Sequence, residues 1–203
     1  MNTSPSLPLP PAALREAVSA RYGAVARDPT TGASFPVGRA YAEAICYPPS
    51  VLDTLPPDAV ATFTGVTYLP GWASFHPGNH VVDLGCGAGV DTLIAASRVG
   101  PSGHVMAIDL APEMVEATRR NARAAGLTNV EVYAAAVEAL PLPSGCADLV
   151  MANGVFNLAA ETDKALAEAF RVLTPGGELL AAEIVLTQAI PRGERDTLDD
   201  WFR

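Results

Sequence analysis

The clearest chemistry in the sequence comes from a glycine-rich stretch that follows a short apolar run. Residues 80–84 read HVVDL, and Gly85, Gly87 and Gly89 follow at alternate positions. Glycines between a strand and a helix permit a tight turn and let a ligand lie against bare backbone, and the start of the helix adds exposed N–H donors. Asp109 comes 20 residues after Gly89, at the end of the next apolar run. A carboxylate at that distance can accept hydrogen bonds from the hydroxyls of a ribose, so the pattern predicts a nucleoside site.

The charge and spacing of this turn indicate which nucleoside ligand it binds. A dinucleotide site uses the spacing G-x-G-x-x-G to cradle a pyrophosphate, whereas here the spacing is G-x-G-x-G and Asp83 precedes it. A carboxylate beside the turn opposes a pyrophosphate and favours a cation. S-adenosylmethionine carries a sulfonium and an ammonium and no phosphate. The charges therefore favour this methyl donor as the cofactor over a nicotinamide dinucleotide.

The turn and several further segments resemble those of class I S-adenosylmethionine-dependent methyltransferases. The chain is most similar to the arsenite methyltransferase-like branch of that family. The resemblance covers roughly residues 79–186, and the segment RVLTPGG is shared by many class I members. The segments that carry it are RYG at 21–23, GCGAGVD at 85–91, VGPSGHV at 99–105, DLAPEM at 109–114, NGVFNL at 153–158 and RVLTPGG at 171–177.

The resemblance implies a set of cofactor-binding residues. Asp109 would hold the ribose, and Tyr22 would cover the sulfonium. Many class I members place an Asp where this chain has Ala136, so the adenine amino group would rely on backbone or on Glu138. The full set implied for the cofactor is Asp83, Gly85, Cys86, Gly87, Gly89, Asp109, Leu110, Met114, Val137, Glu138 and Asn153.

Methyl transfer from a sulfonium is an in-line displacement, so the protein mainly supplies proximity and alignment. A general base is needed only for a nucleophile that must lose a proton of high pKa. The histidines, at positions 76, 80 and 104, fall at or before strand starts, the end of a parallel sheet away from ligands. The sequence thus gives no evident base, and the catalytic candidates are Tyr22, Cys46 and Asn153.

The cysteines bear on the identity of the methyl acceptor. Arsenite enzymes hold As(III) with several thiolates, but here Cys86 lies in the cofactor turn, Cys146 precedes a strand, and only Cys46 could face a substrate. The position after the fourth strand where those enzymes carry a cysteine is Phe156. The first expectation is a small-molecule methyltransferase related to the arsenite enzymes. The alternatives are a C- or O-methyltransferase of a quinone-like or other apolar metabolite, and a truncated, non-catalytic S-adenosylmethionine-binding module.

Apolar periodicity predicts the elements that position these residues. Their alternation predicts an α/β fold, a doubly wound, mostly parallel sheet of the Rossmann-like methyltransferase type, apparently lacking the last strands. We expect a disordered tail at 1–11, a helical flap at 12–76, the cofactor-binding domain at 77–190 and the start of a truncated C-terminal segment at 191–203. The predicted strands are 80–84, 104–109, 130–134, 147–153 and 178–186, and the predicted helices are 13–26, 39–45, 57–63, 90–99, 111–125 and 163–173.

Composition narrows the function classes further. The chain has 203 residues, 49% of them hydrophobic, and a formal net charge of −9. A surface that negative repels phosphate backbones, so we expect no nucleic-acid partner. No metal site, signal peptide or membrane span is predicted, and the three unpaired cysteines suggest the cytoplasm. An open sheet edge exposes apolar surface, so a homodimer covering that edge is a further expectation.

Overall fold

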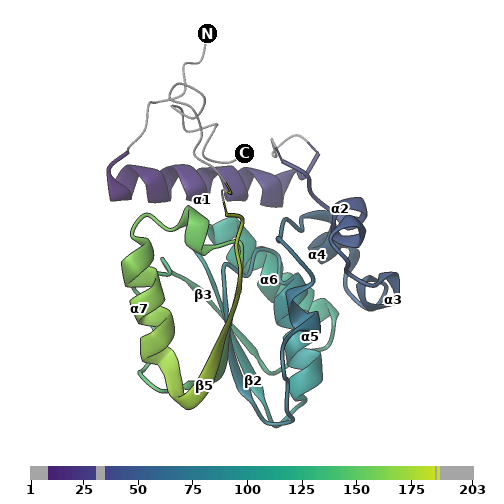
Figure 1. Cartoon of the computed structure of the whole chain (residues 1–203). Coiled ribbons are helices and arrows are strands. Elements are labelled where there is room, and N and C mark those ends of the chain that lie inside the picture. Colours follow the sequence, from purple (N-terminus) through teal and green to yellow (C-terminus); the bar gives the residue numbers. More distant parts are fainter. Residues whose placement is uncertain (1–8, 31–34, 186, 188–203) are drawn as a thin grey trace.

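The computed structural model describes residues 9–30, 35–185 and 187, and its centre is one five-stranded sheet. All neighbouring strands pair in parallel, in the order β3-β2-β1-β4-β5 (Figure 1). A parallel order that runs outward from β1 in both directions brings the carboxyl ends of the strands to one edge, where ligands of such sheets bind. The strands are β1 (His80–Leu84), β2 (His104–Asp109), β3 (Val130–Ala134), β4 (Ala147–Asn153) and β5 (Leu173–Ala182).

Helices cover both faces of the sheet, and the alternation of side chains along β1 decides which helix packs where. Val82 and Leu84 face the cluster that contains the buried alanines of α7 (Thr162–Val172). Val81 faces the opposite way, toward α5 (Val90–Val99). α6 (Pro112–Ala124) packs on the same side as α5, because Val115 contacts Ala107 and Val132. Burying both faces explains why the strands are almost continuously apolar.

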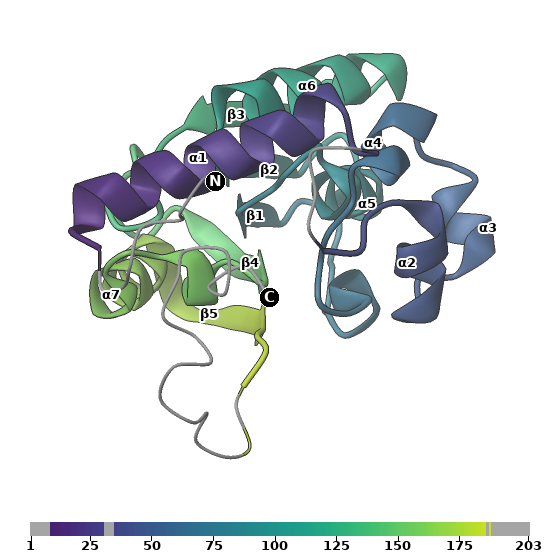
Figure 2. The ribbon, with the colours of Figure 1, turned by 90° about the horizontal axis from the view of Figure 1, so that it is seen from above.

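The N-terminal part of the chain forms a helical flap on this core. α1 (Pro11–Arg27) crosses above the carboxyl ends of the strands, as Figure 2 shows from above. Its residue Val25 packs against Met114 and Ala117 of α6. The short helices α2 (Arg39–Ala44), α3 (Pro49–Leu52) and α4 (Pro57–Ala61) pack with α5 through an apolar cluster that includes Phe63 and Leu93. A short 3-10 turn, η1 (Leu69–Gly71), leads into the core, and η2 (Phe156–Leu158) follows β4.

The predicted fold is confirmed, with one clear error at β5. The strand was predicted at 178–186, after a helix ending at 173, but it spans Leu173–Ala182 and begins directly after α7, so both of its ends differ. The register shifts between Ala147 and Leu149, which pair with Leu173 and Glu178. This bulge absorbs the residues in between, including Gly176 with a φ of +85°, inside the strand. The helices α3 and η1 were not predicted, because a run of three or four residues carries no periodic pattern.

Some predictions concern residues that the structure does not describe, or contacts between chains that it does not test. Most of the tail and the whole segment 191–203 lie outside the described residues, and α1 begins at Pro11, inside the predicted tail. β5 pairs only with β4 in the described sheet, and Leu179 on it and Phe170 on α7 are 39% and 80% exposed. The homodimer across this edge stays a prediction.

The helices within the described ranges include none with the length and apolar character needed to cross a bilayer.

Candidate functional site

Two adjoining cavities lie at the carboxyl edge of the sheet, below α1 and beside the flap. The first encloses about 720 Å³ of atom-free space, its open mouth included. Its walls come from α1, the ends of β1 and β2, the segment after β3 and the turn after β4. The residues that line it are Arg15, Val18, Ser19, Tyr22, Thr64, Gly85, Gly87, Asp109, Leu110, Ala111, Ala136, Val137, Glu138, Asn153, Gly154, Val155, Leu158, Ala159 and Ala160.

The second cavity lies on the flap side of the glycine turn. It shares Thr64, Gly85, Gly87 and Asn153 with the first cavity, so the two meet at the turn. Its walls carry the carboxyl groups of two aspartates and no Lys, Arg or His. The remaining residues that line it are Ala59, Thr62, Phe63, Gly65, Asp83, Cys86, Ala88, Val90, Asp91 and Met114.

The turn between β1 and α5 needs glycine for two separate reasons. Gly85 and Gly87 have φ angles of +70° and +54°, a region that residues with a Cβ rarely adopt. A Cβ on Gly85 would also lie 2.7 Å from Cγ2 of Val155, so the turn after β4 approaches the bare backbone closely. The amide nitrogens of Gly85 and Cys86 both donate to the carbonyl of Ile108, which ties the turn to β2.

Asp109 ends β2 and faces the first cavity. Its carboxylate accepts hydrogen bonds from the backbone N–H groups of Gly87 at 2.9 Å and Ala111 at 2.8 Å, one on each oxygen. A carboxylate has about four acceptor positions, so two remain for ligand hydroxyls. Burial raises the pKa of Asp109 to about 6, against the lowering effect of these amide donors. Asp109 is therefore hydrogen-bonded to the glycine turn and keeps free acceptor positions on the cavity, which is the arrangement needed to bind the hydroxyls of a ribose.

Asp83 and Asp91 place two buried carboxylates beside the second cavity, 2% and 6% exposed. Burial and, after it, the charge of Asp91 raise the pKa of Asp83 to about 8, although the Thr92 hydroxyl, which donates to Asp83 at 2.5 Å, lowers it. Burial likewise raises the pKa of Asp91 to about 6, against donation from Tyr47 and Asn153. A cation that entered here would replace a proton on Asp83.

The remaining predicted residues divide between the cavities and the surface. Tyr22, Leu110, Val137 and Glu138 line the first cavity, and Cys86 and Met114 line the second. Gly89 lines neither, because its role is to end the turn as the N-cap of α5 with a φ of +98°. Cys46 is exposed and lines neither cavity. Burial raises the pKa of Tyr22, with a further contribution from the charge of Asp109.

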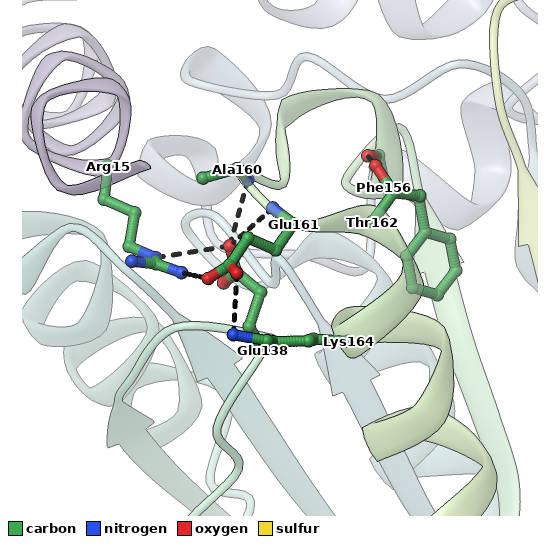
Figure 3. Close-up of polar contacts among 7 residues, drawn as sticks. All are labelled: Arg15, Glu138, Phe156, Ala160, Glu161, Thr162 and Lys164. Atoms are coloured by element: carbon green, nitrogen blue, oxygen red, sulfur yellow. Dashed lines mark hydrogen bonds and ion pairs between the residues drawn. The ribbon is translucent and has the colours of Figure 1, made fainter. Parts of the chain in front are cut away.

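The carboxylate of Glu138 accepts its hydrogen bonds from other parts of the protein. Its Oε1 accepts hydrogen bonds from Arg15 Nε at 3.2 Å, from the N–H of Ala160 at 2.9 Å and from that of Glu161 at 3.3 Å (Figure 3). Its side chain is 5% exposed. A carboxylate oxygen with three donors holds together α1 and the segment after β4, so Glu138 acts first in shaping the cavity.

Asn153 is similarly occupied, at the end of β4. Its Nδ2 donates to Asp91 Oδ2 at 2.8 Å, to the Thr67 carbonyl at 3.0 Å and to the Tyr47 hydroxyl at 3.1 Å. Its Oδ1 accepts from the N–H of Val66 at 2.8 Å and from that of Thr67. Arg15 and Tyr47, which sequence reasoning missed, thus share the site with the predicted residues, and Asp91 belongs to it rather than only to the helix start. No local signal marks Arg15 or Tyr47, because their partners lie 44 to 146 residues away in the chain.

The histidines lie at or before the strand starts, as the sequence predicts, and the cysteines lie apart from one another. His80 and His104 begin β1 and β2, at the edge away from both cavities, and His76 precedes them. Cys146 precedes β4 and is partly buried, while Cys86 is buried behind the turn with Sγ 3.7 Å from Thr118 Oγ1. No two of the three free cysteines lie on one cavity.

Comparison with known proteins decides the family. The family described as a methyltransferase domain matches residues 75–203. The chain belongs to this methyltransferase family. A solved structure of a SAM dependent methyltransferase from Aquifex aeolicus is 30% identical with a TM-score of 0.54, over 71% of this chain and 73% of that one. The resemblance to S-adenosylmethionine-dependent methyltransferases is thereby confirmed.

Two of the curated relatives of this methyltransferase-family chain illustrate different activities by name. An arsenite methyltransferase of Halobacterium salinarum is 38% identical over 59% of this chain and 31% of its own length. A demethylmenaquinone methyltransferase of Symbiobacterium thermophilum is 33% identical over 54% of this chain and 44% of its own length. The chain therefore spans less than half the length of these two relatives.

Proposed function

We propose that this chain binds S-adenosylmethionine and transfers its methyl group to a small molecule. The observation that carries the proposal is the pair of cavities that meet at Gly85 and Gly87, with Asp109 on one side and Asp83 and Asp91 on the other. Hydroxyl-binding acceptors at one end and buried carboxylates at the other match a ligand with a ribose and a cationic tail. A dinucleotide would bring its pyrophosphate against Asp83, so charge disfavours it.

The residues fit this cofactor as follows. Asp109 would bind the ribose, and Leu110, Val137 and Val18 would enclose the base with apolar contacts. The bare backbone of the glycine turn would lie against the sulfur. Asp83 would face the ammonium of the methionine tail, and Asp91 lies on the same cavity. When bound, S-adenosylmethionine supplies an activated methyl group: the sulfur–carbon bond breaks with its electron pair left on sulfur, while a lone pair of the acceptor forms the new bond.

The chain's own contribution to this reaction is position and the exclusion of water. α1 closes the first cavity from above with Arg15, Ser19 and Tyr22. The three histidines lie at the opposite edge of the sheet, so an acceptor whose lone pair needs no general base suits the site. In-line displacement then depends on how well the walls align acceptor and methyl group.

The cysteine arrangement favours an organic acceptor over As(III). Holding a thiophilic ion tightly requires two or three thiolates, and Cys46, Cys86 and Cys146 lie on different parts of the molecule. Phe156 is buried in the core beside β4. The similarity to a demethylmenaquinone methyltransferase supports an apolar organic metabolite as that acceptor. The alternatives are As(III) and a cofactor-binding module without turnover.

Titration calorimetry with S-adenosylmethionine, S-adenosylhomocysteine and NAD⁺ tests the proposal. We expect the two adenosyl sulfur compounds to bind and NAD⁺ not to bind. Asp109→Ala should weaken binding at least tenfold, because the ribose hydroxyls lose a charged acceptor. Asp148→Asn is the matched control, since Asp148 accepts from the His80 N–H at the other edge of the sheet. Binding of NAD⁺ as tight as that of S-adenosylhomocysteine, or no effect of Asp109→Ala, would overturn the proposal.

A further inference from the structure

The flap is joined to the glycine turn by a buried hydrogen-bond network with Tyr47 at its centre. The ring of Tyr47 is 1% exposed and packs edge-on against Phe63 and Tyr68, with centroids 4.6 and 4.9 Å away. Its hydroxyl donates to Asp91 Oδ1 at 2.6 Å and accepts from Asn153 Nδ2 at 3.1 Å. Flap, α5 and β4 therefore meet at one hydroxyl.

Asn153 extends this network into the flap backbone. Its Oδ1 accepts from the amides of Val66 and Thr67, and its Nδ2 donates to the Thr67 carbonyl while also donating to Asp91. One side-chain amide thus fixes three consecutive peptide groups of the flap relative to β4. A Cβ on Gly65 would lie 2.7 Å from Asn153 Nδ2, so the flap backbone approaches this amide closely.

The segment held in this way, residues 62–67, forms the outer wall of the second cavity. Thr62, Phe63, Thr64 and Gly65 line that cavity, and Thr64 also lines the first. Because the opposite wall is the glycine turn with Asp83, moving the segment would open the cavity on the side that would take the ligand's tail. The first cavity, with Asp109 and Val137, has its own walls from β2 and from the segment after β3.

Asp91 is the charged member on which the network depends. A carboxylate in the first turn of α5 would favour the helix dipole equally well from an exposed position. Here it is 6% exposed, and burying a carboxylate costs free energy unless donors replace the lost water. Its two side-chain donors, Tyr47 and Asn153, both contact the 62–67 segment, Tyr47 through Phe63 and Asn153 through the Val66 amide. The buried carboxylate therefore orients the two side chains that hold this segment.

We propose that Asp91 is a positioning residue which, through Tyr47 and Asn153, holds the 62–67 segment against the glycine turn and so shapes the subsite for the ligand's amino-acid tail. This inference rests on the proposed function, because it assumes that the ligand is an adenosyl sulfur compound. It assigns Asn153, a catalytic candidate from the sequence, to positioning. It also separates the tail subsite, which the 62–67 segment walls with Thr62, Phe63, Thr64 and Gly65, from the nucleoside subsite, to which this segment contributes Thr64 alone.

Two ligands that differ only in the tail test this separation. S-adenosylhomocysteine has the tail, whereas 5′-methylthioadenosine has the same nucleoside and sulfur without it. Tyr47→Phe removes one hydroxyl and keeps the packed ring. We expect it to raise the Kd of S-adenosylhomocysteine about tenfold, equivalent to about 1.4 kcal/mol, and to change that of 5′-methylthioadenosine less than twofold. Tyr68→Phe is the matched control, because the Tyr68 hydroxyl accepts from Arg98 outside both cavities.

Asp91→Asn provides a second, graded variant. Its side-chain oxygen can still accept from Tyr47, but its NH₂ then faces the NH₂ of Asn153 and that hydrogen bond is lost. The tail-dependent loss should appear again, together with faster hydrogen exchange at the amides of Val66 and Thr67. Equal weakening of both ligands, or of neither, in Tyr47→Phe would overturn the inference. If the unaltered chain binds neither ligand, the proposed function fails instead, so the two failures are distinguishable.

Discussion

Arg15 and Glu138 are 123 positions apart in the chain, yet Arg15 Nε lies 3.2 Å from Glu138 Oε1 (Figure 3). Arg15 Nη2 also contacts Glu161 Oε2 at 2.7 Å, so one guanidinium joins α1 to the segments that follow β3 and β4. At the other end of α1, Arg27 pairs with Glu113 of α6. The helix is therefore fixed by ion pairs at both ends while its middle, with Ser19 and Tyr22, forms a wall of the first cavity.

Removing the ion pairs of Arg15 with Glu138 and Glu161 should speed ligand release. In Arg15→Gln the buried Glu138 keeps its backbone donors but loses its cation, so the first half of α1 detaches more easily. Because Arg15 is 28% exposed, the loss is modest, about 1 kcal/mol. We expect S-adenosylhomocysteine to dissociate about three- to tenfold faster in stopped-flow displacement. Arg39→Gln, which breaks exposed pairs with Glu43 and Asp53, should leave the rate unchanged; an equal effect would show that α1 is not a barrier to release.

The sequence predicted the core of the fold well because its strands are short apolar runs between glycines and polar turns. The bounds of β1, α5, β2, β3 and β4 agree to the residue. The start of β5 was wrong because Pro175 and the glycines after it are typical of a helix stop, while pairing with β4 absorbs them as a bulge. That pairing is a tertiary contact, which local pattern does not contain.

The same distinction applies to the site. Asp83, Gly85, Gly87 and Asp109 could be placed from spacing alone, because β1 and β2 are neighbours and both end at the ligand edge. The flap is different. Tyr47 has the sequence signature of an ordinary core aromatic, and its role depends on partners brought together only by the packing of the flap on α5.

The variant Asp83→Asn should raise the free energy of unfolding at pH 8 but weaken ligand binding. Burial raises the pKa of Asp83 to about 8, so between about pH 4 and 8 the folded chain holds a proton that the unfolded chain has lost. Each unit of rising pH in that window therefore costs the folded state up to about 1.4 kcal/mol from this one group. Asn carries no such proton, so the variant should gain unfolding free energy over the native chain at pH 8 and lose that advantage toward pH 5. Urea titrations of both proteins at the two pH values measure this difference.

The effect of Asp83 on ligand affinity depends on the same proton. A ligand ammonium that replaces it should bind more weakly as the pH falls from 8 to 6, by up to tenfold per unit, and should release a proton. Calorimetry of S-adenosylhomocysteine in buffers of different ionisation enthalpy reports that proton directly. In Asp83→Asn the affinity at pH 8 should drop about tenfold and its pH dependence should flatten. An unchanged pH profile in the variant would show that Asp83 does not face the ammonium.

Gly85→Ala should be more disruptive than an alanine at another glycine of similar φ. A Cβ there meets Val155 at 2.7 Å in addition to the strain of a φ of +70°. Gly126 has a φ of +69° and open space around the position of its Cβ, so Gly126→Ala reports the backbone strain alone, about 1 kcal/mol. We expect Gly85→Ala to lose about 2–4 kcal/mol of unfolding free energy in urea. Equal losses would mean that Val155 moves aside freely and that the turn is less tightly enclosed than its contacts indicate.

Cys46→Ser distinguishes the two acceptor classes. Cys46 is exposed and has a φ of +76°, and Ser has the same shape and backbone constraints, so the fold and cofactor affinity should not change. With an organic acceptor, methyl transfer from radiolabelled S-adenosylmethionine should stay within twofold of the unaltered chain, because no described contact links Cys46 to either cavity. With As(III) and glutathione, a thiol-dependent enzyme would lose most of its product. A tenfold loss on As(III) in Cys46→Ser would therefore contradict an organic acceptor as the substrate and would require the flap to bring Cys46 to the site.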